Sequence, residues 1–496
     1  MQRFSLSLIH QVLAETHLLA ALTVVETALY WAVNALERIL FVRLGGLPLI
    51  ILWLLAGASF FTLRMGFINL RGFKHAWDVA LGRYDNPEES GDVSHFQAIA
   101  TALSATIGLG NIAGVAIAIQ LGGPGAVVWM TLVGLLGMSS KFVECTLAQK
   151  YRTRHPDGTV AGGPMYYLSQ GLATLGLKPL GQALAVSFAA LCALGGLGGG
   201  NMFQASQAYA AILHIAPALG DYRWAYGLGL TGLVGLVILG GIQRIGAVAG
   251  AIVPTMAGLY IAAALWVLLL HIGELPAAAQ LIWQEAWNPQ SVSGGAVGVM
   301  VQGIRRGLFS NAAGVGTAAI AHAATRTQEP VREGIVASLE PFIDTVVICN
   351  LTALVCVITG AYRDAPDTAL GFDLVAMAFG SAMAGFSLVL TVAVCLFAFS
   401  TIVSWAYYGE QCWRYLTGDG SPLPYRLLYV GATFVGSVSQ PSAVLAFSDL
   451  MLFAIALPNL LGCLLLSNQV ARDLGNYWQR LTTGQMPIHG VQLSQK

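Results

Sequence analysis

Two apolar segments of this chain, each long enough to cross a membrane, are interrupted near their middles by glycine-rich stretches. The first interruption contains Gly108, Gly110 and Gly114, and the second contains Gly314 and Gly316. Glycine allows another group to approach the main chain closely, and free main-chain groups at membrane depth need a ligand, water or neighbouring protein as a partner. Two such breaks at matching places in the chain are typical of the substrate site of a transporter built from two repeats of opposite topology.

The composition indicates an integral membrane protein. Of the 496 residues, 56% are hydrophobic and only 10% are charged, whereas soluble domains carry about 25% charged residues. The 24 basic and 24 acidic residues balance, so nucleic acid is not indicated as a partner. The seven cysteines form no CxxC pair, and we interpret them as reduced packing residues. No HExxH or other catalytic constellation is present, so we expect neither a cofactor nor an enzyme.

Apolar stretches that meet the length of about 20 residues needed to cross a bilayer define the expected fold. They begin near Leu47, Phe96, Ala126, Gly181, Trp224, Ile245, Val297, Gly334, Ala382, Arg426 and Phe447. We therefore predict an all-α integral membrane protein with about eleven transmembrane helices. One extra helix followed by two sets of five makes each broken segment the first member of its set. The predicted architecture is a 5+5 inverted-repeat core with two broken helices.

The expected organisation is a single transmembrane transport domain over residues 46–472, with repeats at about 95–272 and 294–468. Residues 1–20 lack the order of a cleavable signal peptide. The run 21–41 mixes charged with apolar residues, which favours an amphipathic interfacial helix over a twelfth span. We accordingly treat 1–45 as an N-terminal extension and 473–496 as a tail.

Lysine and arginine residues in the loops predict the orientation. They gather in alternate loops, such as 64–83, 150–178 and 326–332, and in the tail, while the intervening loops hold few. Cytoplasmic loops of membrane proteins are enriched in these residues. The tail is therefore predicted in the cytoplasm and the N-terminus outside.

Two adjacent hydroxyl residues, Ser400 and Thr401, lie inside an apolar run of the ninth segment. Hard cations prefer oxygen ligands, so these hydroxyls are candidates for a sodium site. The alternative is that they bond to carbonyls one turn earlier in their own helix. Trp405 follows one turn later, where it would either close a small pocket or serve in packing.

Charged residues inside apolar segments are costly and therefore indicate a function or a buried ion pair. Asp344 follows Glu340 by four residues, so it would bind a cation, accept a hydrogen bond from a broken segment, or form a structural polar pair with Glu340. Lys141 and Glu144 have the spacing of a helical ion pair. Arg306 and the arginine before it precede the second break, where they would form an outer gate or simply snorkel and cap.

Five motifs occur in order along the chain: Gly108-Leu-Gly-Asn-Ile-Ala-Gly-Val-Ala116, Gly122-Gly-Pro-Gly-Ala126, Gly162-Gly-Pro-Met-Tyr-Tyr167, Arg306-Gly-Leu-Phe-Ser-Asn311 and Phe342-Ile-Asp-Thr345. Together they resemble the alanine or glycine:cation symporter family over about Leu47 to Arg472. The resemblance implies sodium-coupled symport of alanine, glycine or a similar small neutral amino acid by alternating access. It also implies a prokaryotic inner-membrane protein with eleven spans and the ten-helix core shared with neurotransmitter:sodium symporters.

The same resemblance implies substrate-binding roles for individual residues. The amides of Leu109 and Gly110 would hold the substrate carboxylate. Its ammonium would bind the carbonyls of Thr106, Phe309, Ser310 and Ala312. Asn111 and Ser310 are candidates for ligand or second-ion contacts, and Asn311 is a further substrate-binding candidate. A pocket too small for large side chains would be shaped by Asn201, Gln204, Phe309 and Trp405.

The resemblance implies one sodium site as well. Its ligands would be the carbonyls of Ser104 and Ile107 and the hydroxyls of Ser400 and Thr401. Asp344 and Arg306 would take part in coupling or gating.

One position departs from the family pattern. Many members carry glutamate after Ser-Asn in the second break, whereas this chain has Ala312. The missing carboxylate leaves open whether sodium or protons are coupled and in what number, and which amino acid and enantiomer are preferred. The oligomeric state is open as well. Two alternatives remain, a proton-coupled amino-acid carrier and a transporter-like amino-acid sensor. A channel is disfavoured because neither break carries a carbonyl-filter sequence.

Overall fold

The computed structural model describes residues 37–38, 40–44, 47–86, 88–154, 159–287, 295–364, 371–382, 385–418, 420–439 and 441–488. The regular structure in these ranges is mostly helical, as predicted. Two short antiparallel strand pairs are β1 (Arg43–Leu44) with β2 (Leu47–Pro48) and β3 (Thr153–Arg154) with β4 (Val160–Ala161). The interfacial helix expected over 21–41 lies almost wholly outside the described residues.

The helices follow one another along the whole described chain. Those of the first half are α2 (Leu49–Arg64), α3 (Ile68–Arg71), α4 (Phe73–Ala80), α5 (His95–Thr106), α6 (Ala113–Gly122), α7 (Ala126–Lys150), α8 (Pro164–Tyr166), α9 (Leu172–Thr174), α10 (Lys178–Leu197), α11 (Phe203–Ile215), α12 (Arg223–Ile238), α13 (Gly241–Leu270) and α14 (Leu275–Trp287). Those of the second half are α15 (Gly295–Asn311), α16 (Ala318–Ala323), α17 (Pro330–Ala337), α18 (Leu339–Pro341), α19 (Asn350–Ile358), α20 (Ala361–Asp364), α21 (Phe372–Ala382), α22 (Phe386–Thr417), α23 (Leu423–Val438) and α24 (Pro441–Thr482). Turns of π-helix join α8 to α9 (Tyr167–Gly171), α10 to α11 (Gly198–Met202) and α18 to α19 (Phe342–Cys349), and 3-10 turns precede α12 (Pro217–Tyr222) and α14 (Ile272–Glu274).

Six helical stretches among the described residues are long and apolar enough to cross a membrane. They are Ala126–Lys150, Lys178–Ile215, Gly241–Leu270, Pro330–Ile358, Phe386–Thr417 and Phe447–Thr482. Other apolar segments fall below this length for two reasons: α2, α12 and α23 have 16 residues each, and the two interrupted segments are each divided into two helices. The count of eleven spans therefore stays a prediction.

Both glycine-rich interruptions end a helix, as the sequence predicts. Helix α5 ends at Thr106 and α6 begins at Ala113, while α15 ends at Asn311 and α16 begins at Ala318. In the second break Gly314 has φ 88° and Gly316 has φ 87°. These are left-handed conformations that glycine adopts without a steric penalty, so the glycines allow the chain to leave the helix at this point.

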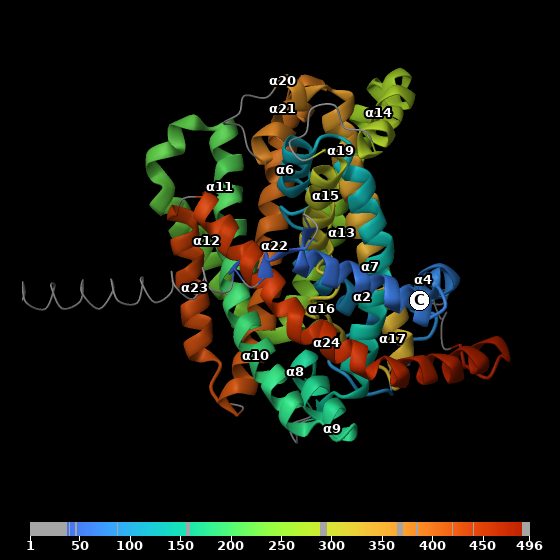
Figure 1. The fold of residues 1–496 in the computed structure, drawn as a ribbon. Coiled ribbons are helices and arrows are strands. Elements are labelled where there is room, and N and C mark those ends of the chain that lie inside the picture. The colour runs from blue at the N-terminus through green and yellow to red at the C-terminus, as the bar shows by residue number, and fades with distance from the viewer. Residues whose placement is uncertain are drawn as a thin grey trace, which may run out of the picture.

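The arrangement of the helices gives the molecule two ends (Figure 1). Helices α7, α10, α22 and α23 run roughly along a common axis, with α8 and α9 at one end and α14, α20 and α21 at the other.

Helix α5 begins directly after Ser94, because a capping box fixes its first turn. The Ser94 side chain accepts from the Gln97 amide, while the Gln97 side chain accepts from the Ser94 amide. Asp92, two residues before Ser94, accepts a hydrogen bond from the Val160 amide of β4. Because β4 leads directly into α8, the start of α5 lies at the α8–α9 end.

Glycines bring the main chains of α7 and its neighbours into contact. A Cβ on Gly334 of α17 would stand 2.0 Å from Thr146 Oγ1 and 2.6 Å from the Phe142 carbonyl oxygen. A Cβ on Gly303 of α15 would stand 2.3 Å from the Ala126 carbonyl oxygen. Membrane helices often pack in this way, through small residues that let main chains approach. Helix α7 is therefore held firmly against both α17 and α15, the helix that leads into the second break.

The substitution Gly334→Ala should lower the melting temperature of the detergent-solubilised protein. The added methyl group meets a main-chain oxygen of α7, which cannot rotate away, and overpacking of this kind costs about 1–3 kcal/mol. Gly232→Ala on α12 is the matched control, because nothing lies within 4 Å of its Cβ position. Equal melting temperatures for the two variants would contradict the packing described.

Candidate functional site

A small cavity lies between the two breaks. Its volume is about 30 Å³, and a water molecule needs roughly 10–15 Å³ by the same kind of measure. The lining combines residues of both interrupted segments with residues of α10, the π-helical turn after it, α11, α22 and α24: Ala105, Thr106, Gly108, Gly110, Gly195, Gly199, Gln204, Phe309, Ser310, Ala312, Trp405, Ser448, Leu452 and Ile455. The cavity thus brings together segments about two hundred residues apart in sequence.

The main chain of the first break is held by two amide side chains. The Gly108 amide donates to Asn111 Oδ1 at 3.0 Å, and the Leu109 amide donates to Gln204 Oε1 at 3.3 Å. Gln204 Nε2 in turn donates to the Gly199 carbonyl at 3.1 Å. Two of the amides freed by the break therefore have protein partners.

Asp344 joins the two breaks through its buried carboxylate. Asp344 Oδ2 accepts from Asn111 Nδ2 of the first break at 2.7 Å, and Oδ1 accepts from the Ser310 hydroxyl of α15 at 2.7 Å. The Thr345 hydroxyl adds a third hydrogen bond at 2.6 Å. Of the roles the sequence left open for Asp344, hydrogen bonding to the broken segments is the one that the structure shows.

The second break combines a strained alanine with side-chain support. Ala312 has φ 49°, in the left-handed region that costs an L-residue about 1–2 kcal/mol. Asn311 Oδ1 accepts from the Ala313 amide at 2.9 Å, and Asn459 Nδ2 of α24 donates to the Gly314 carbonyl at 2.8 Å. These side chains replace the helical partners that the break removes.

Hydroxyl groups gather where α5 ends against α22. Thr401 Oγ1 donates to the Ser104 carbonyl at 2.9 Å, Ser104 Oγ donates to the Ser400 carbonyl at 2.8 Å, and Ser404 Oγ lies 3.0 Å from Ser104 Oγ. Trp405 Nε1 donates to the Ala105 carbonyl at 3.0 Å. Two predicted sodium ligands, the Ser104 carbonyl and the Thr401 hydroxyl, thus lie together at an oxygen-rich contact between the two helices. Ser400 takes part through its carbonyl instead of its hydroxyl. Its hydroxyl donates to the Phe397 carbonyl at 3.0 Å in the same helix, the alternative that the sequence left open.

Two arginines and one aspartate lie beyond the cavity on α15 and α24. Arg306 binds the buried Asp449 carboxylate through two hydrogen bonds of 2.7 and 3.2 Å, and Arg305 Nη2 lies 2.8 Å from Asp449 Oδ2. The Arg306 guanidinium also lies over the Phe309 ring, 5.7 Å from its centroid. Because Ser448 and Phe309 line the cavity, this ion pair stands directly next to it.

The structure divides the predicted substrate residues into two groups. Thr106, Gly110, Gln204, Phe309, Ser310, Ala312 and Trp405 line the cavity. The other four are absent from that lining: Leu109, Asn111, Asn201 and Asn311. The Leu109 amide and the side chains of Asn111 and Asn311 form hydrogen bonds that hold the breaks in place. Asn201 Nδ2 donates to the Tyr429 carbonyl at 2.7 Å. Ile107 is fully buried at the end of α5.

Two charge pairings expected from helical spacing are wrong. Lys141 pairs with Glu340 at 3.1 Å, whereas Glu144 accepts from Asn459 Nδ2 at 2.9 Å. Glu340 does not pair with Asp344, because a π-helical turn begins between them at Phe342 and shifts the angular positions of the residues that follow. Sequence reasoning also missed Asp449, although a lone acidic residue within an apolar segment was the signal that could have found it.

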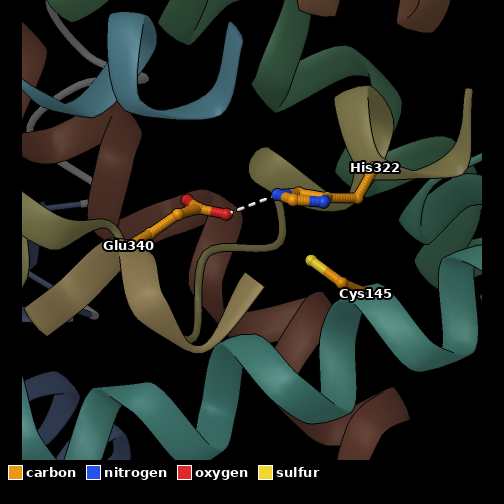
Figure 2. A group of neighbouring side chains, drawn as sticks. All are labelled: Cys145, His322 and Glu340. Carbon is orange, nitrogen blue, oxygen red and sulfur yellow. Dashed lines mark hydrogen bonds and ion pairs between the residues drawn. The ribbon is translucent and has the colours of Figure 1, made fainter. Parts of the chain in front are cut away.

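Cys145, His322 and Glu340 form a buried group whose ligand atoms lie within 4.8 Å of one another. Figure 2 shows His322 facing Glu340, with Cys145 on α7 nearby. His322 Nε2 lies 2.6 Å from Glu340 Oε1, and the Lys141 ammonium lies 3.1 Å from the other carboxylate oxygen. Both oxygens already face a nitrogen, so this group is an ion-pair network rather than a metal centre.

Residues 26–490 match the family model of the sodium:alanine symporter family. This chain belongs to that family. The sodium:alanine symporter family is one of membrane transporters, in agreement with the apolar helices of this member and with its internal cavity.

Relatives support the same assignment. The sodium/alanine symporter AgcS of Methanococcus maripaludis is 41% identical over 429 residues, covering 86% of this chain and 93% of that protein. The putative sodium/proton-dependent alanine carrier protein YrbD of Bacillus subtilis is 34% identical, covering 88% and 91%. The probable sodium/glutamine symporter GlnT of Bacillus subtilis is also 34% identical, covering 89% and 90%. These relatives are therefore named for different substrates, alanine and glutamine.

One solved structure shows the fold. MhsT in complex with L-phenylalanine superposes with a TM-score of 0.52 at 16% sequence identity, covering 76% of this chain and 88% of that one. At this identity the similarity concerns the fold alone. The member of the sodium:alanine symporter family described here therefore shares the helical arrangement of MhsT.

The substitution Asp344→Asn should destabilise this symporter-family protein by about 1–3 kcal/mol, because an amide cannot accept all three hydrogen bonds and leaves a buried donor unpaired. Melting temperature in detergent measures the effect. Asp373→Asn is the matched control, since Asp373 lies in the first turn of α21, outside both breaks. A melting temperature equal to that of the control would show that Asp344 does not hold the breaks together.

Proposed function

We propose that this protein carries small neutral amino acids, alanine and glycine in particular, across the membrane together with sodium ions. The observation that supports this most directly is the cavity at the meeting point of two broken helices, lined by residues of both. A zwitterion suits such a place, because its carboxylate accepts from free amides and its ammonium donates to free carbonyls. The alanine symport named for AgcS agrees with this chemistry.

The substrate carboxylate would bind the amide of Gly110, a residue of the cavity lining. The Leu109 amide would join it if Gln204 Oε1, its present acceptor, turns away. Carbonyl groups of Thr106, Phe309, Ser310 and Ala312 would accept from the substrate ammonium. The glycine at 108 leaves room for this exchange, since a Cβ there would lie 2.9 Å from Thr401 Oγ1.

The size of the cavity favours a short side chain. Phe309 and Trp405 enclose it with the apolar residues Leu452 and Ile455 of α24. A Cβ on Gly200 would lie 2.3 Å from the Trp405 ring, so the indole is fixed in place on its other face. Alanine and glycine, which carry one side-chain carbon or none, fit this lining better than larger amino acids do.

A sodium ion would bind where α5 meets α22. The proposed ligands are the carbonyls of Ser104 and Ile107 with the hydroxyls of Ser400 and Thr401. The Thr401 hydroxyl already points at the Ser104 carbonyl, and a sodium ion between the two oxygens would take the place of that hydrogen bond. Since Thr106 of the same helix end lines the cavity, ion and substrate would stabilise the same arrangement of the first break.

We further propose eleven spans in a 5+5 inverted-repeat core, with the N-terminus outside and the C-terminus in the cytoplasm of a prokaryotic inner membrane. The distribution of lysine and arginine supports this orientation. It places the α8–α9 end in the cytoplasm and the pair of Arg306 with Asp449 between the cavity and the outside. Transport by alternating access then requires this outer ion pair to open and reform in every cycle.

Uptake of radiolabelled alanine and glycine into proteoliposomes tests the function. We expect accumulation driven by a sodium gradient with no proton gradient present. Accumulation driven only by a proton gradient would identify a proton-coupled carrier instead. Binding without accumulation under either gradient would identify an amino-acid sensor.

The substitution Thr401→Ala should raise the sodium concentration needed for half-maximal uptake by about tenfold, the effect of losing roughly 1.4 kcal/mol of ion binding. The apparent affinity for alanine at saturating sodium should change less. Thr391→Ala on the same helix is the control, because its hydroxyl bonds to the Ala211 carbonyl away from the cavity. An unchanged sodium requirement in Thr401→Ala would remove this residue from the ion site.

The substitution Leu452→Ala should let larger neutral amino acids compete with alanine. Each methylene group that a pocket gains or loses changes discrimination by about 10–200-fold, so valine should inhibit alanine uptake at concentrations at least about tenfold lower than in the unmodified protein. Leu450→Ala provides the control, because Leu450 is buried on the same helix but does not line the cavity. Identical inhibition profiles for both variants would contradict the proposed limit on substrate size.

A further inference from the structure

A buried carboxylate between two imidazoles lies at the α8–α9 end of the molecule. Glu333 of α17 is fully buried, with one carboxylate oxygen against His95 Nδ1 and the other 2.5 Å from His322 Nδ1. The Thr325 hydroxyl also donates to Glu333, at 2.9 Å. We call His95, Glu333 and His322 the acid–imidazole cluster. Its three side chains come from α5, α17 and α16, so it joins both broken helices to a third helix.

The cluster must hold at least one proton. No lysine or arginine of the described residues lies within ion-pair distance of Glu333, and Lys141 offsets Glu340 at 3.1 Å instead. An unpaired buried carboxylate costs several kcal/mol. The missing positive charge is therefore supplied by a proton, whether it resides on an imidazole or on Glu333 itself.

A route for this proton leads towards water. His95 Nε2, on the far side of the ring from Glu333, lies 3.8 Å from Asp85 Oδ1. Neither atom has a hydrogen-bond partner among the described residues. The Asp85 side chain is 40% exposed, whereas His95 is 1% exposed. Because an imidazole can take up a proton at one nitrogen and release it from the other, His95 connects the buried carboxylate with the surface.

The cluster sits among contacts that close this end of the protein. The Asp92 amide donates to the Ala324 carbonyl, and the Arg326 amide donates to the Val93 carbonyl, each at 2.8 Å. The Arg152 guanidinium bonds the Thr325 and Ser90 carbonyls at 2.6 and 3.1 Å. The start of α5 is thereby tied to the end of α16, and its separation from α17 would pull His95 away from Glu333.

Other charged groups surround the cluster without replacing its proton. Lys141 on α7 and Glu340 on α18 lie on the side of the cluster that faces the middle of the molecule, where Glu340 contacts His322. Three further charged residues lie in the loops at the surface of the α8–α9 end: Asp85, Arg152 and Arg326. Arg332 of α17 donates to the Tyr84 carbonyl and Met486 Sδ rather than to Glu333.

We propose that the acid–imidazole cluster is a proton-binding site, and that its proton is released to the cytoplasm when this end opens and bound again when it closes. Opening separates His95 from Glu333 and admits water, which removes the need for a buried compensating charge. Acidic conditions in the cytoplasm therefore favour the closed state. The inference relies on the proposed transport function only for the orientation and for the opening step.

Calorimetric titration of alanine into the sodium-loaded, detergent-solubilised protein tests the proposal. Alanine bound between the two breaks should favour the arrangement in which the cytoplasmic end is closed, because it holds the broken segments together. Heats measured in buffers of different ionisation enthalpy then give the number of protons taken up on closure, and we expect up to about one per alanine bound. The uptake should be lost in Glu333→Gln and in His95→Gln. It should persist in the control His75→Gln, because burial lowers the pKa of His75 to about 4 and leaves it without a proton at neutral pH. Unchanged proton uptake in both cluster variants would overturn the proposal.

A second measurement separates this inference from the proposed function. If alanine does not bind at all, the substrate assignment fails, but the cluster can still be tested by melting temperature without ligand. A proton that binds more tightly to the folded than to the unfolded state stabilises the folded state at low pH, and this stabilisation is lost as the pH rises. Between about pH 6 and about pH 9, on either side of the ordinary histidine pKa of about 6.5, the unmodified protein and His75→Gln should lose more stability than Glu333→Gln. Equal pH profiles for all three would show that the cluster binds no proton.

Discussion

The hydrogen bonds of Asp344 are the interaction on which the site depends. A break in a membrane helix frees main-chain groups that lipid cannot satisfy, so two facing breaks persist only if other groups hold them in register. The Asp344 carboxylate does this by accepting from Asn111 on one side and Ser310 on the other. Around it, Gln204 and Asn459 bind main chain of the first and the second break. The cavity lies between the two breaks that these hydrogen bonds hold in place.

Charge pairs are placed on both sides of that cavity. Arg306 and Asp449 join α15 to α24 on one side, and the acid–imidazole cluster with Lys141 and Glu340 joins α5, α16, α17, α18 and α7 on the other. Buried charges are expensive to separate because each loses its partner in a poorly solvated place. Helices α15 and α16 flank the second break, so one interrupted segment takes part in both sets of contacts. Any movement of this segment therefore changes the electrostatics on both sides.

Much of this was predictable from the sequence, and the limits have physical causes. Glycine spacing identified both breaks, and the pair Ser400 and Thr401 identified the contact with α5. Only Thr401 makes that contact through its hydroxyl, because the Ser400 hydroxyl donates to the Phe397 carbonyl of its own helix. The pairing of Lys141 with Glu340 was missed because it connects residues far apart in the chain. Glu340 and Asp344 do not pair because a π-helical turn after Pro341 changes the helical phase between them. Asn111 and Asn311 were expected at the substrate but instead bond to Asp344 and to the Ala313 amide. Sequence indicates that an amide is needed at a break, but not which partner it takes.

The ion pairs on both sides of the cavity suggest how the proposed transport would be coupled. Opening towards one side breaks the ion pairs of that side, and the cost can be offset only if charges there become hydrated or reprotonated while those of the other side stay intact. Breaking both sides at once would expose Asp449 and Glu333 together and add the two costs, which makes a continuous pore the least favourable arrangement. Under the proposed function, a bound zwitterion and its sodium ion would supply partners for the freed main chain of both breaks, and so they would stabilise the arrangement in which the breaks lie together. In the proposed function, the coupling between ion and substrate would therefore originate in the shared geometry of the breaks, and alternating access would originate in the buried charges on either side of them.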